Sequence, residues 1–201
     1  MPDAIVTTLS DSDYTSSAAR IDPAMSPLLL RAFAEVESGG RSGFNAAGLP
    51  VIAYEGHIFR KYTKSQYDAQ YPLLSYPYKV KAGPEWKQNN RTQDIAYQTL
   101  AAASALDANA AQMACSWGMF QVMGFNYADC AYPDVGTFVT AMKSGAKAHI
   151  DAFVAFCLKR KGMKAAMLGK QYATMATLYN GPNFGDYDKR IEKAYTRLGG
   201  K

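Results

Sequence analysis

The stretch SPLLLRAFAEVESGG, residues 26–40, constrains the fold more than any other part of the chain. Its Ser-Pro start is typical of a helix N-cap and first helical position, and its Gly-Gly end is typical of a helix C-terminus. We therefore predict an amphipathic helix that ends at Glu37 or Ser38. Such a helix must bury its apolar side, so the chain has to build a core against it.

The last turn of this helix places a glutamate among apolar residues. At about 100° per residue, Leu29, Phe33 and Val36 share one side of the helix. Glu37 falls between Phe33 and Leu30. Burial raises the pKa of a carboxyl group, and the helix C-terminus raises it further. A raised pKa suits a general acid near neutral pH, although such a side chain can also simply extend into solvent.

Glu35, two positions earlier, falls on the other side of the same helix. It lies next to Arg31 at the i,i+4 spacing at which opposite charges attract. We expect a solvent-exposed ion pair between them and no catalytic role for Glu35.

A second carboxylate closes the run VIAYE. If this run is a strand, Val51, Ala53 and Glu55 share a face. Cleavage of a glycosidic bond uses two carboxyl groups: one protonates the leaving oxygen, and the other activates water or stabilises the oxocarbenium-like state. Glu55 fits the second role, but it could also cap or pair at the start of the next helix. His57 could orient Glu55 or a sugar hydroxyl, or be a scaffold residue.

Most of the other segments have helical patterns. We predict a mainly α, α+β chain of one domain over residues 1–201, a helical bundle with a small β-hairpin around VIAY. A surface loop is expected at 73–88, and helices are expected at 91–113, 135–160, 163–179 and 186–197, after a capped N-terminal helix in LSDSDYTSSAARI.

The composition argues against metal and nucleotide chemistry. The chain has three cysteines and two histidines without zinc-ligand spacing, and no Walker or dinucleotide-binding glycine motif. We predict no metal and no cofactor. The three cysteines are expected to be reduced and buried.

Charge is distributed unevenly. Residues 141–201 hold twelve Lys/Arg and four Asp/Glu, a net of +8, within a total of +5. A basic C-terminal third suits an anionic surface or cell-wall polymer. The segment 143–170 could instead make the chain a non-catalytic binder of anionic membranes, although a core-facing helix with a solvated basic end is favoured. Aromatic residues are not interleaved with the basic cluster, so nucleic-acid binding is not expected.

The N-terminal sequence MPDAIVTTLSDSDY lacks the basic and apolar regions of a secretion signal, and no apolar run could span a bilayer. We therefore expect the protein to stay in the cytoplasm unless another factor releases it. A monomer is the default expectation for a small lytic enzyme.

Four motifs come in an order known from the lysozyme-like superfamily: VESGG, YEGHIF, SWGMFQVMG and LYNGP. They resemble goose-type lysozymes, lytic transglycosylases and, more closely, phage endolysins of the N-acetylmuramidase family, over roughly residues 9–197. The resemblance implies cleavage of the peptidoglycan β-1,4 bond after N-acetylmuramic acid. It also implies storage in the host cytoplasm until a holin opens the inner membrane, and a catalytic module without a separate wall-binding repeat.

The resemblance also assigns roles to residues. It implies that Glu37 is the acid and Glu55 the second acidic position, and that Gln121 lines the glycan cleft. It places Tyr179 and Asn180 near the acid. Further residues that could contact substrate are Ser116, Trp117 and His57. Tyr54 before Glu55 and Gly56 after it depart from the family pattern. The resemblance therefore does not predict the backbone conformation at Gly56.

Two other activities stay open at this level. A lytic transglycosylase needs one carboxylate and forms 1,6-anhydro-muramic ends. A glucosaminidase cuts the other glycosidic bond of the strand, one sugar further along. The second carboxylate, Glu55, favours hydrolysis, because it can activate a water molecule.

Overall fold

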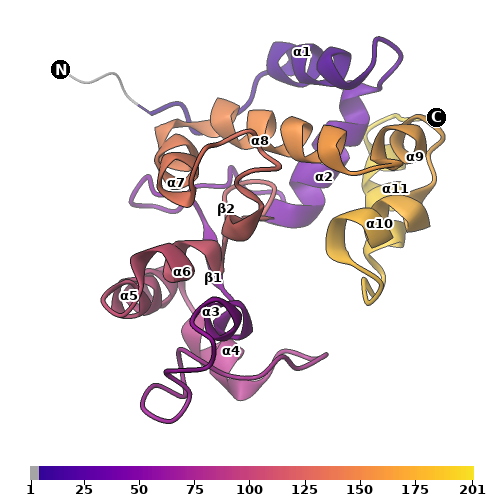
Figure 1. The fold of residues 1–201 in the computed structure, drawn as a ribbon. Helices are drawn as coiled ribbons and strands as arrows, with labels where there is room; N and C mark the ends of the chain where they lie inside the picture. Colours follow the sequence, from indigo (N-terminus) through magenta and orange to yellow (C-terminus); the bar gives the residue numbers. More distant parts are fainter. Residues whose placement is uncertain (1–4) are drawn as a thin grey trace.

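The computed structural model describes residues 5–201, so the first four residues of the predicted domain lie outside it. Within this range the chain forms mainly α-helices and one small sheet (Figure 1). The elements are α1 Asp11–Ile21, α2 Pro27–Ser38, β1 Ile52–Tyr54, α3 Gly56–Tyr62, α4 Pro84–Asn89, α5 Gln93–Ser104, α6 Ala108–Met113, β2 Cys115–Trp117, β3 Val122–Met123, η1 Gly124–Asn126, α7 Val135–Ser144, α8 Ala146–Lys159, α9 Met163–Leu168, α10 Tyr172–Asn180 and α11 Tyr187–Arg197.

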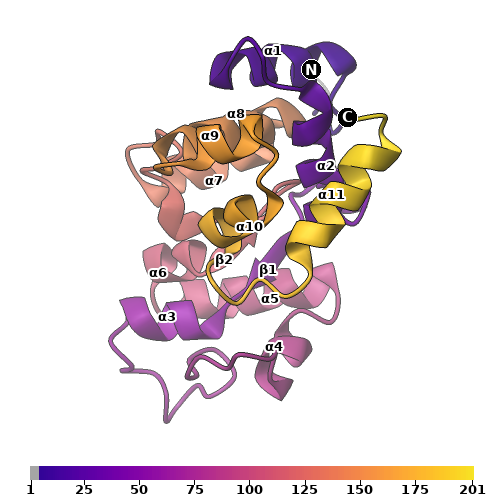
Figure 2. The ribbon, with the colours of Figure 1, turned by 90° about the vertical axis from the view of Figure 1, so that its right-hand side faces the viewer.

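The helices form two groups with the strands between them. Helices α3 to α6 lie on one side of β1 and β2, and α1, α2 and α7 to α11 lie on the other (Figures 1 and 2). In Figure 2, α11 runs beside α2, and the two helices are in contact. The mainly α fold with a small β element that the sequence predicts is confirmed.

Helix α2 forms as the sequence predicts. Ser26 is its N-cap residue in extended backbone, and Pro27 is the first helical residue. The helix ends at Gly39, whose φ of 63° is the left-handed conformation that glycine adopts without strain. Its side chains Leu29, Leu30 and Phe33 are buried, so the first two turns of α2 pack against the core.

The sheet is antiparallel with the order β1-β2-β3. Ile52 of β1 pairs with Trp117 of β2, and Tyr54 pairs with Cys115. The local hairpin expected around VIAY is therefore only part of the arrangement, since β1 takes its main partner about sixty residues later in the chain. A single bridge between Phe44 and Pro50 is what remains of the local pairing.

Several predicted helices are divided, and one predicted loop contains a helix. The segment 135–160 is broken at Gly145, whose backbone (φ 147°, ψ 171°) is non-helical. The segments 91–113 and 163–179 are likewise each two helices, separated by short turns. Helix α4 begins inside the segment predicted as loop, because Gly83 and Pro84 provide a helix start there.

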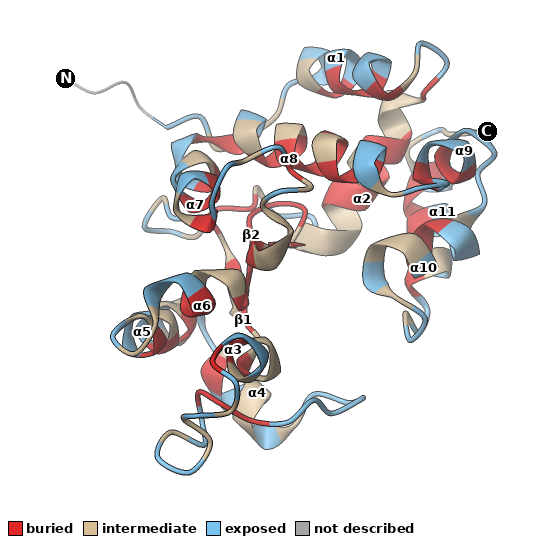
Figure 3. Ribbon diagram, in the orientation of Figure 1, coloured by how far each residue is buried: buried red, intermediate tan, exposed pale blue. Residues whose placement is uncertain are grey.

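The apolar residues of the basic C-terminal third face the core. Ile150, Phe153, Val154 and Cys157 of α8 are all buried. Figure 3 shows buried residues along α8 and the adjoining α2. This agrees with the favoured interpretation of a core-facing helix. The basic residues at the end of α8 are exposed or partly exposed.

A buried histidine holds the turn between β2 and β3 in place. His149 Nδ1 accepts a hydrogen bond from Met119 N at 3.0 Å, and its Nε2 lies 2.7 Å from the carbonyl of Met142. Burial lowers the pKa of His149 to about 4, so the ring is neutral at neutral pH. Gly118 has a φ of 69°, and a Cβ there would lie 2.6 Å from the His149 ring. Glycine is therefore required for this close approach.

Candidate active site

Glu37 lies in the last turn of α2, facing α11. Burial raises the pKa of its carboxyl group to about 7, against the lowering effects of a hydrogen bond from Tyr187 and the nearby charge of Arg190. The Tyr187 hydroxyl donates that hydrogen bond to Oε1. The carboxyl group can thus hold a proton near neutral pH, which is the property required of a general acid.

Two tyrosines stack behind this carboxyl group. The rings of Tyr179 and Tyr187 are nearly parallel, with centroids 6.2 Å apart, and both contact the ring of Phe33 edge-on. The hydroxyl of Tyr179 donates to the carbonyl of Phe120. The tyrosine that contacts Glu37 is therefore Tyr187, whereas the sequence places only Tyr179 and Asn180 near the acid.

Glu35 has a different partner from the one expected. It pairs with Arg197 of α11, and its predicted partner Arg31 pairs instead with Asp11 of α1 and lies over the Tyr14 ring. The i,i+4 prediction is wrong, because α1 and α11 pack on either side of α2 and supply charges that compete with local pairing. Glu35 is partly buried between α2 and α11.

Glu55 occupies the N-cap position of α3, directly after β1, but its side chain makes no capping hydrogen bond. Trp86 Nε1 donates to Glu55 Oε1 at 2.8 Å, and His57 Nδ1 lies 3.4 Å from Oε2. The side chains of Glu55 and His57 are 23% and 24% exposed. They line a cavity of about 200 Å³ together with Trp86 and the segment around Tyr78. Glu55 is therefore held from two sides and still open to solvent.

Gln121 uses its amide within the protein. Its Nε2 donates to the carbonyls of Gly118 at 2.8 Å and Val51 at 3.2 Å, and its Oε1 accepts from the Ser116 hydroxyl at 2.7 Å. Its backbone has a φ of 46°, which is uncommon for a residue other than glycine. These contacts fasten the turn between β2 and β3 to the segment that leads into β1.

The structure brings the predicted residues together as two hydrogen-bonded groups. One joins Glu37 to Tyr187, against whose ring Tyr179 stacks. In the other, Trp86 donates to Glu55, and His57 lies close to the same carboxylate. Strand β2, which carries Ser116, and the turn after it, which carries Gln121, link the two groups, because Tyr179 bonds to Phe120 on that turn and β2 pairs with β1. Asn180 is exposed at the end of α10, and Trp117 is buried in the core.

Sequence reasoning missed two residues of these groups. A signal for Tyr187 was available: Tyr187, Ile191 and Ala194 recur at helical spacing, which predicts that they share the buried side of a helix, and all three are buried. Trp86 follows the Gly-Pro pair that starts α4, which could have been recognised as a helix start. Neither signal shows that the residue reaches a glutamate.

The family model for N-acetylmuramidase matches residues 26–199, which include both hydrogen-bonded groups. The chain belongs to the N-acetylmuramidase family. The predicted resemblance to this family is thereby confirmed.

A solved structure gives a second comparison for this N-acetylmuramidase family member. The crystal structure of the Burkholderia AP3 phage endolysin has a TM-score of 0.81 and 37% sequence identity, over 98% of this chain and 74% of that one. No match is found among curated proteins. Family membership and the likeness to a phage endolysin together support a peptidoglycan-degrading enzyme.

Over residues 5–201, no helix is both long and apolar enough to cross a membrane. The same residues contain no group of three or more His, Cys, Asp or Glu side chains arranged to hold a metal ion.

Proposed function

We propose that this chain is an endolysin that hydrolyses the β-1,4 bond between N-acetylmuramic acid and N-acetylglucosamine, with Glu37 as general acid. The observation that carries the proposal is the partly buried Glu37 carboxyl group, whose pKa of about 7 leaves a large protonated fraction at neutral pH. From this position Glu37 donates its proton to the leaving glycosidic oxygen as the bond breaks.

Glu55 is proposed as the second carboxyl group of the reaction. Trp86 and His57 fix its orientation, and its partial exposure gives water access to it. In this role Glu55 activates the attacking water or stabilises the positive charge that develops on the sugar ring. Ser116, Gln121, Tyr179 and Asn180 are proposed to shape or contact the bound glycan.

The bond that is cut can be determined from the products. Purified peptidoglycan is digested, and the released fragments are analysed by mass spectrometry with and without borohydride reduction. The proposal expects reducible muramic acid ends. Anhydro-muramic ends would instead identify a lytic transglycosylase, and reducible glucosamine ends a glucosaminidase.

The role of Glu37 needs a variant with a matched control. Glu37→Gln keeps the size and the ability to accept from Tyr187, but it removes the proton donor. We expect its turnover on peptidoglycan to fall by at least about a hundredfold, within the range that general acid catalysis contributes. Glu192→Gln, the same change at an exposed position of α11, should retain activity. A fully active Glu37→Gln protein would reject this assignment.

We propose a monomeric, single catalytic domain that is kept in the host cytoplasm until the inner membrane is opened. Analytical ultracentrifugation tests the oligomeric state. Fractionation of producing cells before and after permeabilisation of the inner membrane tests the location.

A further inference from the structure

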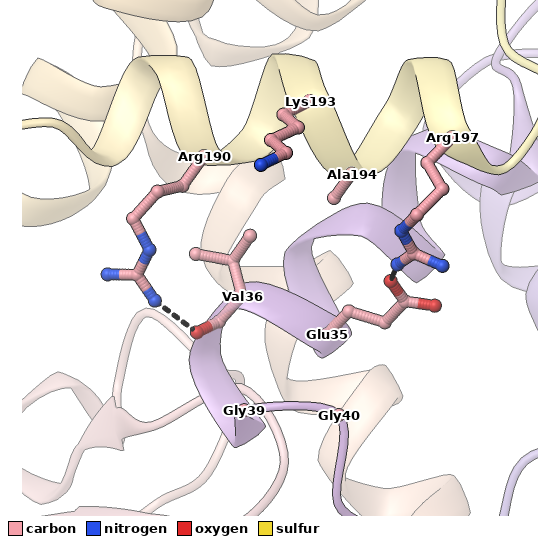
Figure 4. A pocket seen from close by; sticks show the side chains of 8 residues that line it. All are labelled: Glu35, Val36, Gly39, Gly40, Arg190, Lys193, Ala194 and Arg197. Atoms are coloured by element: carbon pink, nitrogen blue, oxygen red, sulfur yellow. Dashed lines mark hydrogen bonds and ion pairs between the residues drawn. The ribbon is translucent and has the colours of Figure 1, made fainter.

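A pocket of about 330 Å³ lies between the end of α2 and the last two turns of α11, as Figure 4 shows. We call it the α2–α11 pocket. The residues that line it are Glu35, Val36, Gly39, Gly40, Arg190, Lys193, Ala194 and Arg197.

The α2–α11 pocket is cationic. Three of its residues, Arg190, Lys193 and Arg197, carry positive charge, and Glu35 carries the one negative charge, so three minus one gives a net of +2. Glu35 is paired with Arg197. Arg190 is directed toward α2 by a hydrogen bond to the carbonyl of Val36 at 3.0 Å. Lys193 has no acidic partner among the described residues, so its ammonium group is available to an anion.

The side of the pocket formed by the end of α2 is open. Gly39 and Gly40 have φ values of 63° and 78°, and a Cβ at either position would meet no atom within 4 Å. The end of α2 therefore leaves space next to the cationic side chains. A ligand group larger than a single ion can enter there.

The α2–α11 pocket adjoins the proposed acid. Val36, which lines the pocket, directly precedes Glu37 in α2. On α11, Arg190 follows Tyr187 by one helical turn, and Tyr187 holds the Glu37 carboxyl group. Arg190 therefore connects the acid to the pocket: its charge acts on the Glu37 carboxyl group, and it lines the pocket together with Lys193.

Peptidoglycan carries anionic substituents next to the cleaved bond. Each N-acetylmuramic acid carries a lactyl ether at C3, and the peptide attached to it holds free carboxylates, whereas N-acetylglucosamine has no such group. Arginine and lysine side chains bind carboxylates through charge-assisted hydrogen bonds.

We propose that the α2–α11 pocket binds a carboxylate of the peptide stem on the muramic acid residue next to the cleaved bond. The inference rests on the proposed function. It gives the enzyme a means to prefer glycan strands that carry peptide stems over bare strands, through Lys193 and Arg190.

The test compares two substrates. One is a preparation of purified glycan strands with their stems, and the other is the same preparation after an amidase has removed the stems. We expect the wild-type chain to cleave the stem-bearing strands with a kcat/KM about threefold to tenfold higher, the effect of about 1 kcal/mol of added binding. Lys193→Glu should abolish most of this ratio.

Lys189→Glu is the matched control, because it makes the same charge change on the same helix at an exposed position outside the pocket. It should keep the wild-type ratio. Equal ratios in all three proteins would overturn the inference. An equal loss on both substrates in Lys193→Glu would also overturn it, and would point to general attraction toward anionic wall polymers.

A binding measurement separates this inference from the proposed function. Glu37→Gln protein is titrated with N-acetylmuramyl-L-alanyl-D-glutamate and with its amidated form, which lacks one carboxylate. Weaker binding of the amidated form, with the difference lost in the Glu37→Gln/Lys193→Gln double variant, supports the pocket. Equal binding of the two ligands contradicts it. If the wild-type chain cleaves neither kind of strand, the proposed function is rejected. The titration would still show whether the pocket binds the carboxylate.

Discussion

The hydroxyl group of Tyr187 donates a hydrogen bond to the carboxyl group of Glu37 and joins two helices that lie 150 residues apart in the sequence. Two opposing effects act on this carboxyl group: burial favours its neutral form, and the tyrosine hydroxyl favours its charged form. The outcome is a pKa of about 7. Tyr187 is therefore a positioning residue that also limits how far this pKa rises.

Replacing Tyr187 by Phe should move the pH profile. The hydroxyl lowers the pKa of Glu37, so its removal raises that pKa above about 7. A general acid acts while it is protonated, so the alkaline limb of kcat/KM should shift to higher pH. Tyr195→Phe, a change at another buried tyrosine of the same helix, should leave the limb in place. A shift toward lower pH in Tyr187→Phe would contradict the proposed contact.

Glu37→Gln should also change stability, in a direction set by pH. The ordinary pKa of 4.5 is raised to about 7 in the fold, so the folded chain binds this proton more tightly than the unfolded chain. Stability is therefore lost as the pH rises from about 4.5 through 7. Gln cannot ionise, so the variant should be more stable at pH 8, by at most about 3 kcal/mol, and similar near pH 4. Urea unfolding at both pH values measures this difference.

Trp86→Phe should impair catalysis through Glu55. Phenylalanine keeps an aromatic ring in the cavity but removes the N–H that bonds to Oε1 at 2.8 Å. A hydrogen bond to a charged group contributes about 1.5–3 kcal/mol, so we expect kcat/KM to fall by about tenfold to a hundredfold. In a Glu55→Ala background the same change should have little further effect. Full additivity of the two changes would show that Trp86 acts independently of Glu55.

Gln121→Ala should affect stability more than substrate binding. The change leaves the carbonyls of Gly118 and Val51 without their side-chain donor and the Ser116 hydroxyl without its acceptor. Loss of such partners in a partly buried site costs about 1–3 kcal/mol, which a denaturation curve detects. An unchanged unfolding midpoint together with a raised KM would instead show that Gln121 mainly binds the glycan.

The sequence was sufficient where local rules govern the structure. The Ser-Pro start and Gly-Gly end of α2, together with its apolar side, correctly predict the helix and the burial of Leu29 and Phe33. The same helical wheel places Glu37 among apolar residues, and the direction of its pKa shift follows from that position. Hydrophobic periodicity and capping act over a few residues, so one sequence suffices to identify them.

Side-chain partners could not be predicted in this way. Local spacing predicts an ion pair between Glu35 and Arg31. In the packed structure, Glu35 instead forms an ion pair with Arg197, and Arg31 forms one with Asp11. Similarly, the predicted helix 135–160 is divided at Gly145. Val6 lies close to the backbone there, and the N–H of Ala146 donates a hydrogen bond to the carbonyl of Val6. These contacts depend on elements that are distant along the chain, and a local pattern contains no information about them.

The sequence by itself thus determined the mainly α character, helix α2 with both of its ends, the family, and a glutamate among apolar residues at the end of α2. Only the tertiary structure decided that Tyr187 contacts Glu37, that Trp86 contacts Glu55, and that Arg190 and Lys193 face the end of α2 across a pocket. The physical reason is that residue type and spacing fix which face of a helix is buried, whereas hydrogen bonds and charges act over a few ångströms. Their partners are set by how whole helices pack.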